Sequence, residues 1–163
     1  MAEMIEMESK ELLGVSREVR TFTMWLNALG AEVKGDDEGW HITNLFESLS
    51  DGVIILRVLE LVGSNQSDGG KTFVNWRKAN RHPKNRYHRV ENCNYCLELA
   101  KVLGFSLHNI GGLDILDKNS KIVQAFLWQL MNYHICRLLN LGGDKSVDIQ
   151  NLEKWVDSFV FCA

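Results

Sequence analysis

The chain has 163 residues, of which 45% are hydrophobic and 24% charged, so it is long enough for one domain with a buried core and flanking segments. Its net charge of −3 argues against a nucleic-acid-binding protein, and no apolar run reaches the ~20 residues of a membrane span. The acidic first 14 residues lack the order of a signal peptide, so a cytosolic protein is expected.

The first predicted helix covers residues 17–29. Its apolar residues recur at helical spacing, Ser16 is placed to cap its start, and Gly30 follows its end. These apolar residues are Val19, Phe22, Trp25, Leu26 and Leu29. The polar stretch that follows, residues 31–40, is expected to be a loop.

Two helices are predicted between residues 45 and 63. The shorter one is indicated by three apolar residues, and the longer one by a helical stripe that Asp51 is placed to cap and Gly63 to end. The apolar residues are Leu45, Phe46 and Leu49 in the first, and Val53, Ile54, Leu56, Leu59 and Val62 in the second.

The chain between residues 63 and 89 is predicted to be irregular. It begins with a glycine-rich polar loop, residues 63–72, and Pro83 disfavours helical backbone at His82. Residues 77–89 contain no acid and six basic residues: Arg77, Lys78, Arg81, Lys84, Arg86 and Arg89. This basic stretch is expected either to attract an acidic partner surface or to be a solvated loop.

A further helix is predicted over residues 90–103 by apolar residues on one face, with Gly104 at its end. A glycine-rich turn at residues 110–112 then leads to a short apolar segment, Leu113 to Leu116.

The most apolar helix is predicted over residues 120–139. A helix that is apolar nearly all round is either central to the core or covered by a partner. One more amphipathic stretch, residues 149–159, follows. Because no segment alternates as a strand does, the predicted fold class is all-α.

Two of the four cysteines, Cys93 and Cys96, form a C-x-x-C in the middle of a helical pattern. No second such pair and no spaced histidine pair accompanies them, so we interpret them as buried packing residues and all four cysteines as free thiols. The acids at residues 36–38 have no regular ligand spacing, and no metal site is predicted.

No catalytic motif is present in the sequence. Phosphate-binding glycine loops, zinc-protease and calcium-binding patterns are absent, and the five histidines lie far apart in sequence. Ser106 lacks the second glycine of a nucleophile elbow. We therefore expect no enzyme activity, no catalytic residue and no cofactor.

Several segments, in this order, resemble a calponin-homology (CH) domain. They are REVRTFTMWLNAL at 17–29, NLFESLSDG followed by VIIL at 44–56, VNWRK at 74–78, RVENCNY at 89–95, and DILD with KIVQAFLWQLM at 114–131. The resemblance extends over about residues 15–140. The segments REVRTF, NWRK and RVENCNY are most similar to the third CH domain of the fimbrin/plastin family. That domain opens the second actin-binding half of those proteins.

The resemblance implies a compact bundle of four main helices plus short ones, in which Trp25, Trp76 and Trp128 belong to the core. It also implies a filamentous-actin-binding module of a cross-linking protein in the cytoplasm and cytoskeleton. The implied partners are actin and a following CH domain, with no nucleic acid or membrane.

In the CH family the first helix and the last core helix supply much of the actin contact. Carried over to this sequence, that implicates exposed positions of both helices. On the first helix these are Arg20, Met24 and Asn27, and on the last helix they are Lys121, Gln124, Leu127 and Met131.

The resemblance divides the chain into an acidic segment at 1–14, a CH domain at 15–142, and a linker at 143–163 that enters the first helix of a following CH domain. We expect the segment 147–163 to fold back on the domain or pair with another copy. Two alternative functions are a signalling or scaffold CH domain that binds a protein other than actin, and a microtubule-binding CH domain.

Overall fold

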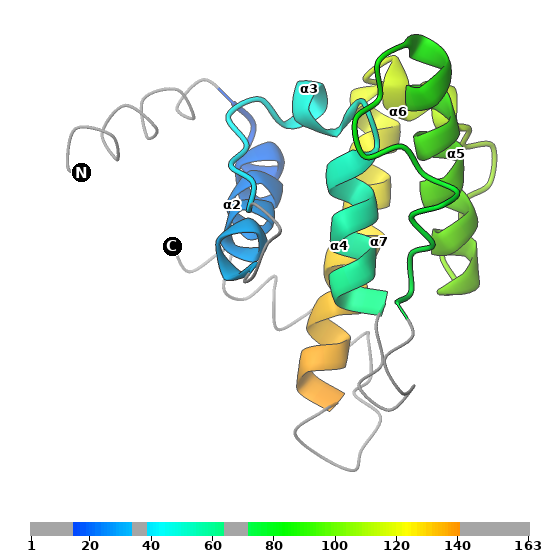
Figure 1. Cartoon of the computed structure of the whole chain (residues 1–163). Coiled ribbons are helices and arrows are strands. Elements are labelled where there is room, and N and C mark those ends of the chain that lie inside the picture. Colours follow the sequence, from blue (N-terminus) through cyan, green and yellow to red (C-terminus); the bar gives the residue numbers. More distant parts are fainter. Residues whose placement is uncertain (1–14, 34–38, 64–71, 141–163) are drawn as a thin grey trace.

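The computed structural model describes residues 15–33, 39–63 and 72–140. In these ranges every regular element is a helix, which confirms the predicted all-α class. The helices α4 and α7 lie side by side at the centre, with α2 on one side and α5 and α6 on the other (Figure 1). The bounds are α2 Arg17–Glu32, α3 Leu45–Leu49, α4 Val53–Gly63, α5 Arg86–Val102, α6 Gly112–Leu116 and α7 Ser120–Asn140.

Helix α2 begins as predicted and ends later than predicted. The Ser16 hydroxyl accepts a hydrogen bond from the Val19 N–H at 3.4 Å, which confirms Ser16 as the cap. The prediction that Gly30 follows the helix is wrong, because Gly30 is buried inside it. A Cβ there would lie 2.3 Å from the backbone oxygen of Trp40, so glycine permits the close approach of a returning loop. The Trp40 indole N–H donates to the Leu26 carbonyl at 2.9 Å and holds that loop in place.

Polar side chains cap the starts of α3 and α4. The Asn44 side chain accepts from the Glu47 N–H at 3.2 Å, and the Asp51 carboxylate accepts from the Val53 N–H at 3.0 Å. Both interactions satisfy backbone donors that a helix start leaves unpaired. The predicted short helix and the predicted cap at Asp51 are therefore confirmed.

Helix α5 begins four residues earlier than the predicted helix, so the expectation of irregular chain up to Arg89 is wrong for residues 86–89. The Asn85 side chain accepts from the His88 N–H at 2.9 Å and caps this start. Pro83 stands two residues before that cap, where it costs the helix nothing. At the other end, Gly104 with φ of 87° stops the helix, as predicted.

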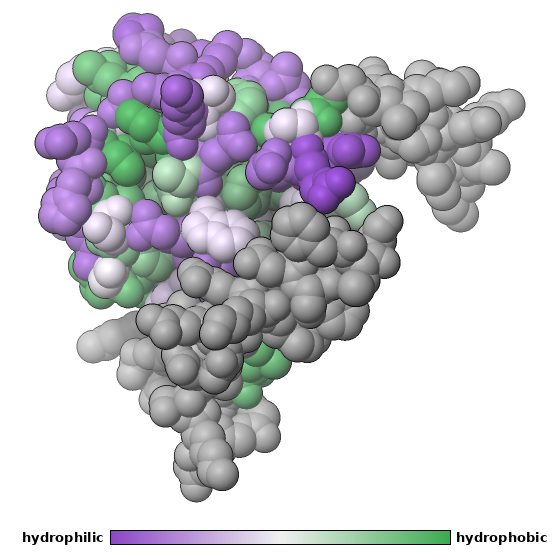
Figure 2. Space-filling model, turned by 180° about the vertical axis from the view of Figure 1, so that it is seen from behind, coloured by the Kyte–Doolittle hydropathy of each residue, from purple (hydrophilic) through white to green (hydrophobic). Residues whose placement is uncertain are grey.

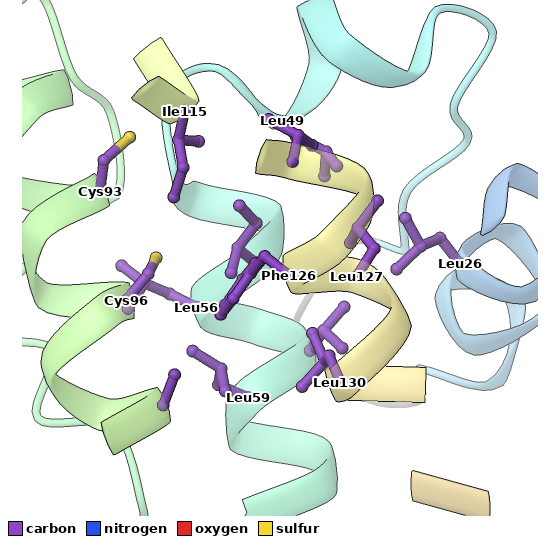
Figure 3. Packing of buried hydrophobic residues seen from close by; sticks show 14 of the residues in the cluster. Leu26, Leu49, Leu56, Leu59, Cys93, Cys96, Ile115, Phe126, Leu127 and Leu130 are labelled. Carbon is purple, nitrogen blue, oxygen red and sulfur yellow. The ribbon is translucent and has the colours of Figure 1, made fainter. Parts of the chain in front are cut away.

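The core is shared by all six helices, and α4, α5 and α7 meet within it. Figure 3 shows Leu56 and Leu59 of α4, Cys96 of α5 and Phe126 of α7 directed toward one another. All four residues are 0% exposed to solvent. This arrangement makes α7 the central helix of the bundle.

The tryptophans predicted to lie in the core are less buried than expected. Trp25 and Trp76 are half-buried, packing against the core from its edge, while Trp128 is 39% exposed. Trp25 and Trp76 have indole N–H groups that need a partner, and each finds one at the rim of the bundle. The core assignment is therefore wrong for Trp128 and only partly correct for the other two.

Within the described ranges, no helix is long and apolar enough to cross a membrane. The acidic segment 1–14, most of the two predicted polar loops and the predicted stretch 149–159 lie outside the described residues, as does the hypothesis about 147–163.

Candidate partner-binding surface

The three α2 residues predicted to contact a partner differ in exposure. Met24 is 66% exposed, and Arg20 is half-buried. Asn27 is also half-buried, and its amide is already used: it donates to the Ile42 carbonyl at 3.0 Å and accepts from the Ile42 N–H at 2.6 Å. Met24 is thus the most exposed of the three. Asn27 instead holds the segment before α3 against α2.

The four α7 residues predicted to form an exposed line do not share one face. Lys121 is exposed and Gln124 half-buried, whereas Leu127 is 0% and Met131 7% exposed. Each residue of an α-helix advances ~100°, so Leu127 lies roughly 120° and Met131 roughly 80° around the axis from Lys121. Figure 3 shows Leu127 on the side of α7 that faces Leu26 of α2. The assumption that Leu127 and Met131 are exposed is therefore wrong, because they belong to the core.

The exposed face of α7 runs instead through Lys121, Ala125, Trp128 and the half-buried Asn132. These positions follow the spacing i, i+4, i+7 and i+11, which keeps residues within roughly 60° of one another. Sequence reasoning missed Ala125, Trp128 and Asn132. The same spacing, counted from Lys121, would have found all three.

Helices α2 and α7 are joined by a hydrogen bond at their contact. The Trp25 Nε1–H donates to His134 Nδ1 at 3.2 Å, and the ring centroids are 6.0 Å apart. Burial lowers the pKa of His134 below its ordinary value; Glu32 opposes this shift and Arg137 adds to it. The neutral imidazole is the form that accepts from the indole, so the lowered pKa keeps this contact intact.

The six basic side chains of residues 77–89 are all exposed. Arg81 stacks over the Trp76 ring with its guanidinium carbon 4.2 Å from the centroid, and the Trp76 indole N–H donates to the Glu60 carboxylate. Arg86 pairs with Asp117 at 3.0 Å. The stretch is therefore not a featureless loop, since part of it is anchored to α4 and α6.

The surface opposite the view of Figure 1 mixes hydrophobic and hydrophilic residues. Figure 2 shows hydrophobic side chains reaching this surface in several places, each bordered by hydrophilic ones. Single exposed apolar residues among polar neighbours are usual on a protein surface.

The C-x-x-C residues are packing residues, as predicted. Both are buried, and the Cys93 and Cys96 thiols each lie 3.4 Å from a backbone carbonyl oxygen, of Ser50 and Gly52 respectively. Burial, with a smaller contribution from Asp51, raises the pKa of Cys93 to about 12, and burial also raises that of Cys96. Thiols held protonated in this way are poor nucleophiles and poor metal ligands. The described residues contain no group of three or more side chains arranged to hold a metal ion.

The fold and these surfaces define an all-helical domain built on one core, with two helices joined at a Trp–His contact. Residues 16–136 match the family model described as the calponin homology (CH) domain, and the chain therefore belongs to the calponin homology domain family. This confirms the family that the sequence motifs indicated.

Among its relatives, the chain is 40% identical over 126 residues to Fimbrin-4 of Arabidopsis thaliana, covering 77% of this chain and 17% of that protein. It is 35% identical to Fimbrin of Schizosaccharomyces pombe (87% and 22% covered) and 34% identical to Plastin-3 of Homo sapiens (90% and 22% covered). The chain thus spans about a fifth of the length of these relatives.

A solved structure, the actin-crosslinking core of Schizosaccharomyces pombe fimbrin, is 37% identical to this chain with a TM-score of 0.62. The match covers 76% of this chain and 24% of that one. The fold is therefore the one that this fimbrin uses in one part of its actin-crosslinking core.

Proposed function

We propose that this domain is a non-catalytic module that binds filamentous actin within a fimbrin/plastin-type cross-linking protein. The observation that carries the proposal is the likeness in sequence and fold to the actin-crosslinking core of a fimbrin. The motifs REVRTF, NWRK and RVENCNY favour the position of the third CH domain. A cytoplasmic, cytoskeletal location follows from that assignment, with neither nucleic acid nor membrane as a partner.

The proposed contact surface combines exposed and half-buried residues of α2 and α7. Arg20 and Met24 represent α2, and Lys121, Gln124 and Trp128 represent α7. A partly exposed tryptophan is a side chain that interface hot spots favour, because the indole buries a large area at small entropic cost. Asn27, Leu127 and Met131 act from behind this surface by holding the two helices in place.

The proposed domain division keeps residues 1–14 as an acidic segment, 15–142 as the CH domain and 143–163 as the entry to a following CH domain. Two linked domains bind one filament more tightly than either alone, since the second contact is intramolecular. A following CH domain is therefore expected to strengthen binding without changing the surface on α2 and α7.

Co-sedimentation with filamentous actin tests the proposal, using the 163-residue chain and a longer version that carries a following CH domain. Trp128→Ala should weaken binding roughly 30-fold, the loss expected of a hot spot worth about 2 kcal/mol. Lys121→Glu should weaken actin binding more at low salt than at high salt, because salt screens the charge. The matched control is Lys101→Glu, an exposed lysine in the last turn of α5, which should bind as the parent does.

If neither version pellets with actin, the actin function is wrong and a scaffold role takes its place. Pelleting with microtubules but not with actin would point instead to the microtubule-binding class. If Trp128→Ala and Lys101→Glu weaken binding equally, the domain still binds actin. The proposal that α7 forms the contact surface would then be wrong.

A further inference from the structure

A second surface feature is a groove formed by the end of α3, the start of α5 and the end of α6. Its volume is about 570 Å³. The lining residues are Glu47, Ser50, Lys84, Asn85, Arg86, Arg89, Leu116, Asp117 and Lys118. Four of these are basic and two acidic, so the lining has a net charge of +2 (4 − 2) at neutral pH.

The two acids of the groove are already neutralised by two of its bases. Asp117 pairs with Arg86 at 3.0 Å, and Glu47 pairs with Lys118. Lys84 and Arg89 form no ion pair with any described residue and are exposed. The groove therefore offers two uncompensated cations between two closed ion pairs, and both stand at the positive end of the dipole of the 17-residue helix α5.

The geometry points to residues 1–14 of this same chain as the occupant, and we propose that their glutamates bind Lys84 and Arg89 in the groove. The segment carries Glu3, Glu6, Glu8 and Glu11 against a single lysine. Its charge is opposite to that of the groove. The groove and the segment are thus complementary in sign and similar in the number of charges.

The segment is tethered close enough to reach the groove. It joins the domain at Val15, which lines a pocket together with Asn44, Leu45 and Phe46 at the start of α3. Glu47 of the same short helix already lines the groove, and one helical turn spans only about 5.4 Å. Fourteen extended residues span up to roughly 46 Å, which is long compared with a single helical turn.

The tether makes a weak electrostatic contact effective. A short covalent connection gives an effective concentration on the order of millimolar, so individual ion pairs of modest strength suffice for occupancy at low salt. The contact should be lost as salt shortens the screening length. Because the segment covers part of the basic stretch 77–89, any acidic partner that uses the groove must compete with it.

The experiment records amide NMR spectra of the whole chain and of a variant in which Glu3, Glu6, Glu8 and Glu11 are all replaced by glutamine. Neutralising the four acids should shift the amide signals of Lys84, Arg89 and Lys118 while leaving Ala125 on α7 in place. Raising NaCl from about 20 mM to about 500 mM should move the parent signals toward those of the variant.

A second arm adds a synthetic peptide of residues 1–14 to the four-glutamine variant. The peptide should shift the same groove signals saturably, and its affinity should fall at least about tenfold when Lys84→Glu and Arg89→Glu are introduced into that variant. The same variant carrying Lys101→Glu instead is the matched control, and its affinity should be unchanged. Groove signals that do not respond to neutralisation, or a peptide that binds the charge-reversed groove equally well, would overturn the proposal.

Discussion

Asn92 illustrates how one buried polar side chain organises segments distant in sequence. It is 0% exposed, and its amide makes three hydrogen bonds. Its Oδ1 accepts from the Asn80 N–H at 2.8 Å, while its Nδ2 donates to the carbonyls of Asn80 and Asp51 at 2.9 and 3.1 Å. The amide thereby ties the irregular chain before α5 and the turn before α4 to helix α5.

Asn92→Ala is expected to lower the free energy of unfolding by about 3 kcal/mol, because it leaves three backbone groups without their buried partner. Urea denaturation followed by circular dichroism measures this loss. The neighbouring Glu91 is exposed on the same helix, so Glu91→Ala should change the value by no more than about 0.5 kcal/mol. A loss at Asn92 as small as that at Glu91 would mean that the three bonds add nothing to stability.

At the scale of single elements, α7 has two faces with different tasks. The buried face holds Phe126, Leu127 and Leu130 against the rest of the core, and the exposed face carries Lys121 and Trp128. The helix is so rich in apolar residues that its hydrophobic pattern does not distinguish the two. Its position between α2 and α4 does.

Leu127→Ala should therefore lower the free energy of unfolding by about 2–5 kcal/mol, the usual range for emptying a fully buried leucine site. Lys121→Ala on the exposed face should change it by less than about 0.5 kcal/mol. Chemical denaturation of both variants measures the difference. If Leu127 were a surface contact residue, as first expected, the two substitutions would have similar small effects on stability.

The contact between α2 and α7 is expected to make stability depend on pH through His134. Its pKa is lowered in the folded state, so below its ordinary value near 6.5 the unfolded chain binds more protons than the folded one. Stability is thus highest above that value and falls as the pH drops, until the folded pKa is passed. Glu32 and Arg137 are the charged groups that act on His134, with opposite effects.

Urea denaturation at several pH values between about 7.5 and about 5 measures this dependence. His134→Gln keeps an acceptor for the Trp25 indole but does not titrate, so its stability should fall less over this range than that of the parent chain. Parallel curves for the two proteins would assign the pH dependence to groups other than His134.

On the scale of the whole molecule, the described residues form one continuous core to which every helix contributes. Such an arrangement favours a single cooperative transition, because no helix has a separate core to retain. The half-buried tryptophans Trp25 and Trp76 report on two different contacts, with α7 and with α4 respectively.

Thermal unfolding followed by tryptophan fluorescence and by far-ultraviolet circular dichroism should therefore give coincident transitions. Trp25→Phe and Trp76→Phe variants each remove one of the five tryptophans, and the fluorescence of each variant should change at the same midpoint as its own circular dichroism signal. An early fluorescence change in only one variant would reveal a part of the bundle that unfolds independently.

Much of this domain follows from the sequence by itself. Helix existence and type, the caps at Ser16 and Asp51, the stop at Gly104 and the burial of Cys93 and Cys96 are set by neighbours within a turn or by periodicity along one segment. These are local properties, and local chemistry is fully present in the sequence. The family follows as well, since its motifs recur in order.

Other features were decided only by the tertiary structure. Gly30 stays helical because a distant Trp40 packs on it, and which side of α7 is covered depends on where α2 and α4 lie. A helical pattern fixes the spacing of residues but, when every side is apolar, not the direction of the core. The sequence therefore led to the prediction that Leu127 and Met131 are exposed and that Trp128 is in the core. The packing of neighbouring helices against α7 shows the reverse for all three residues.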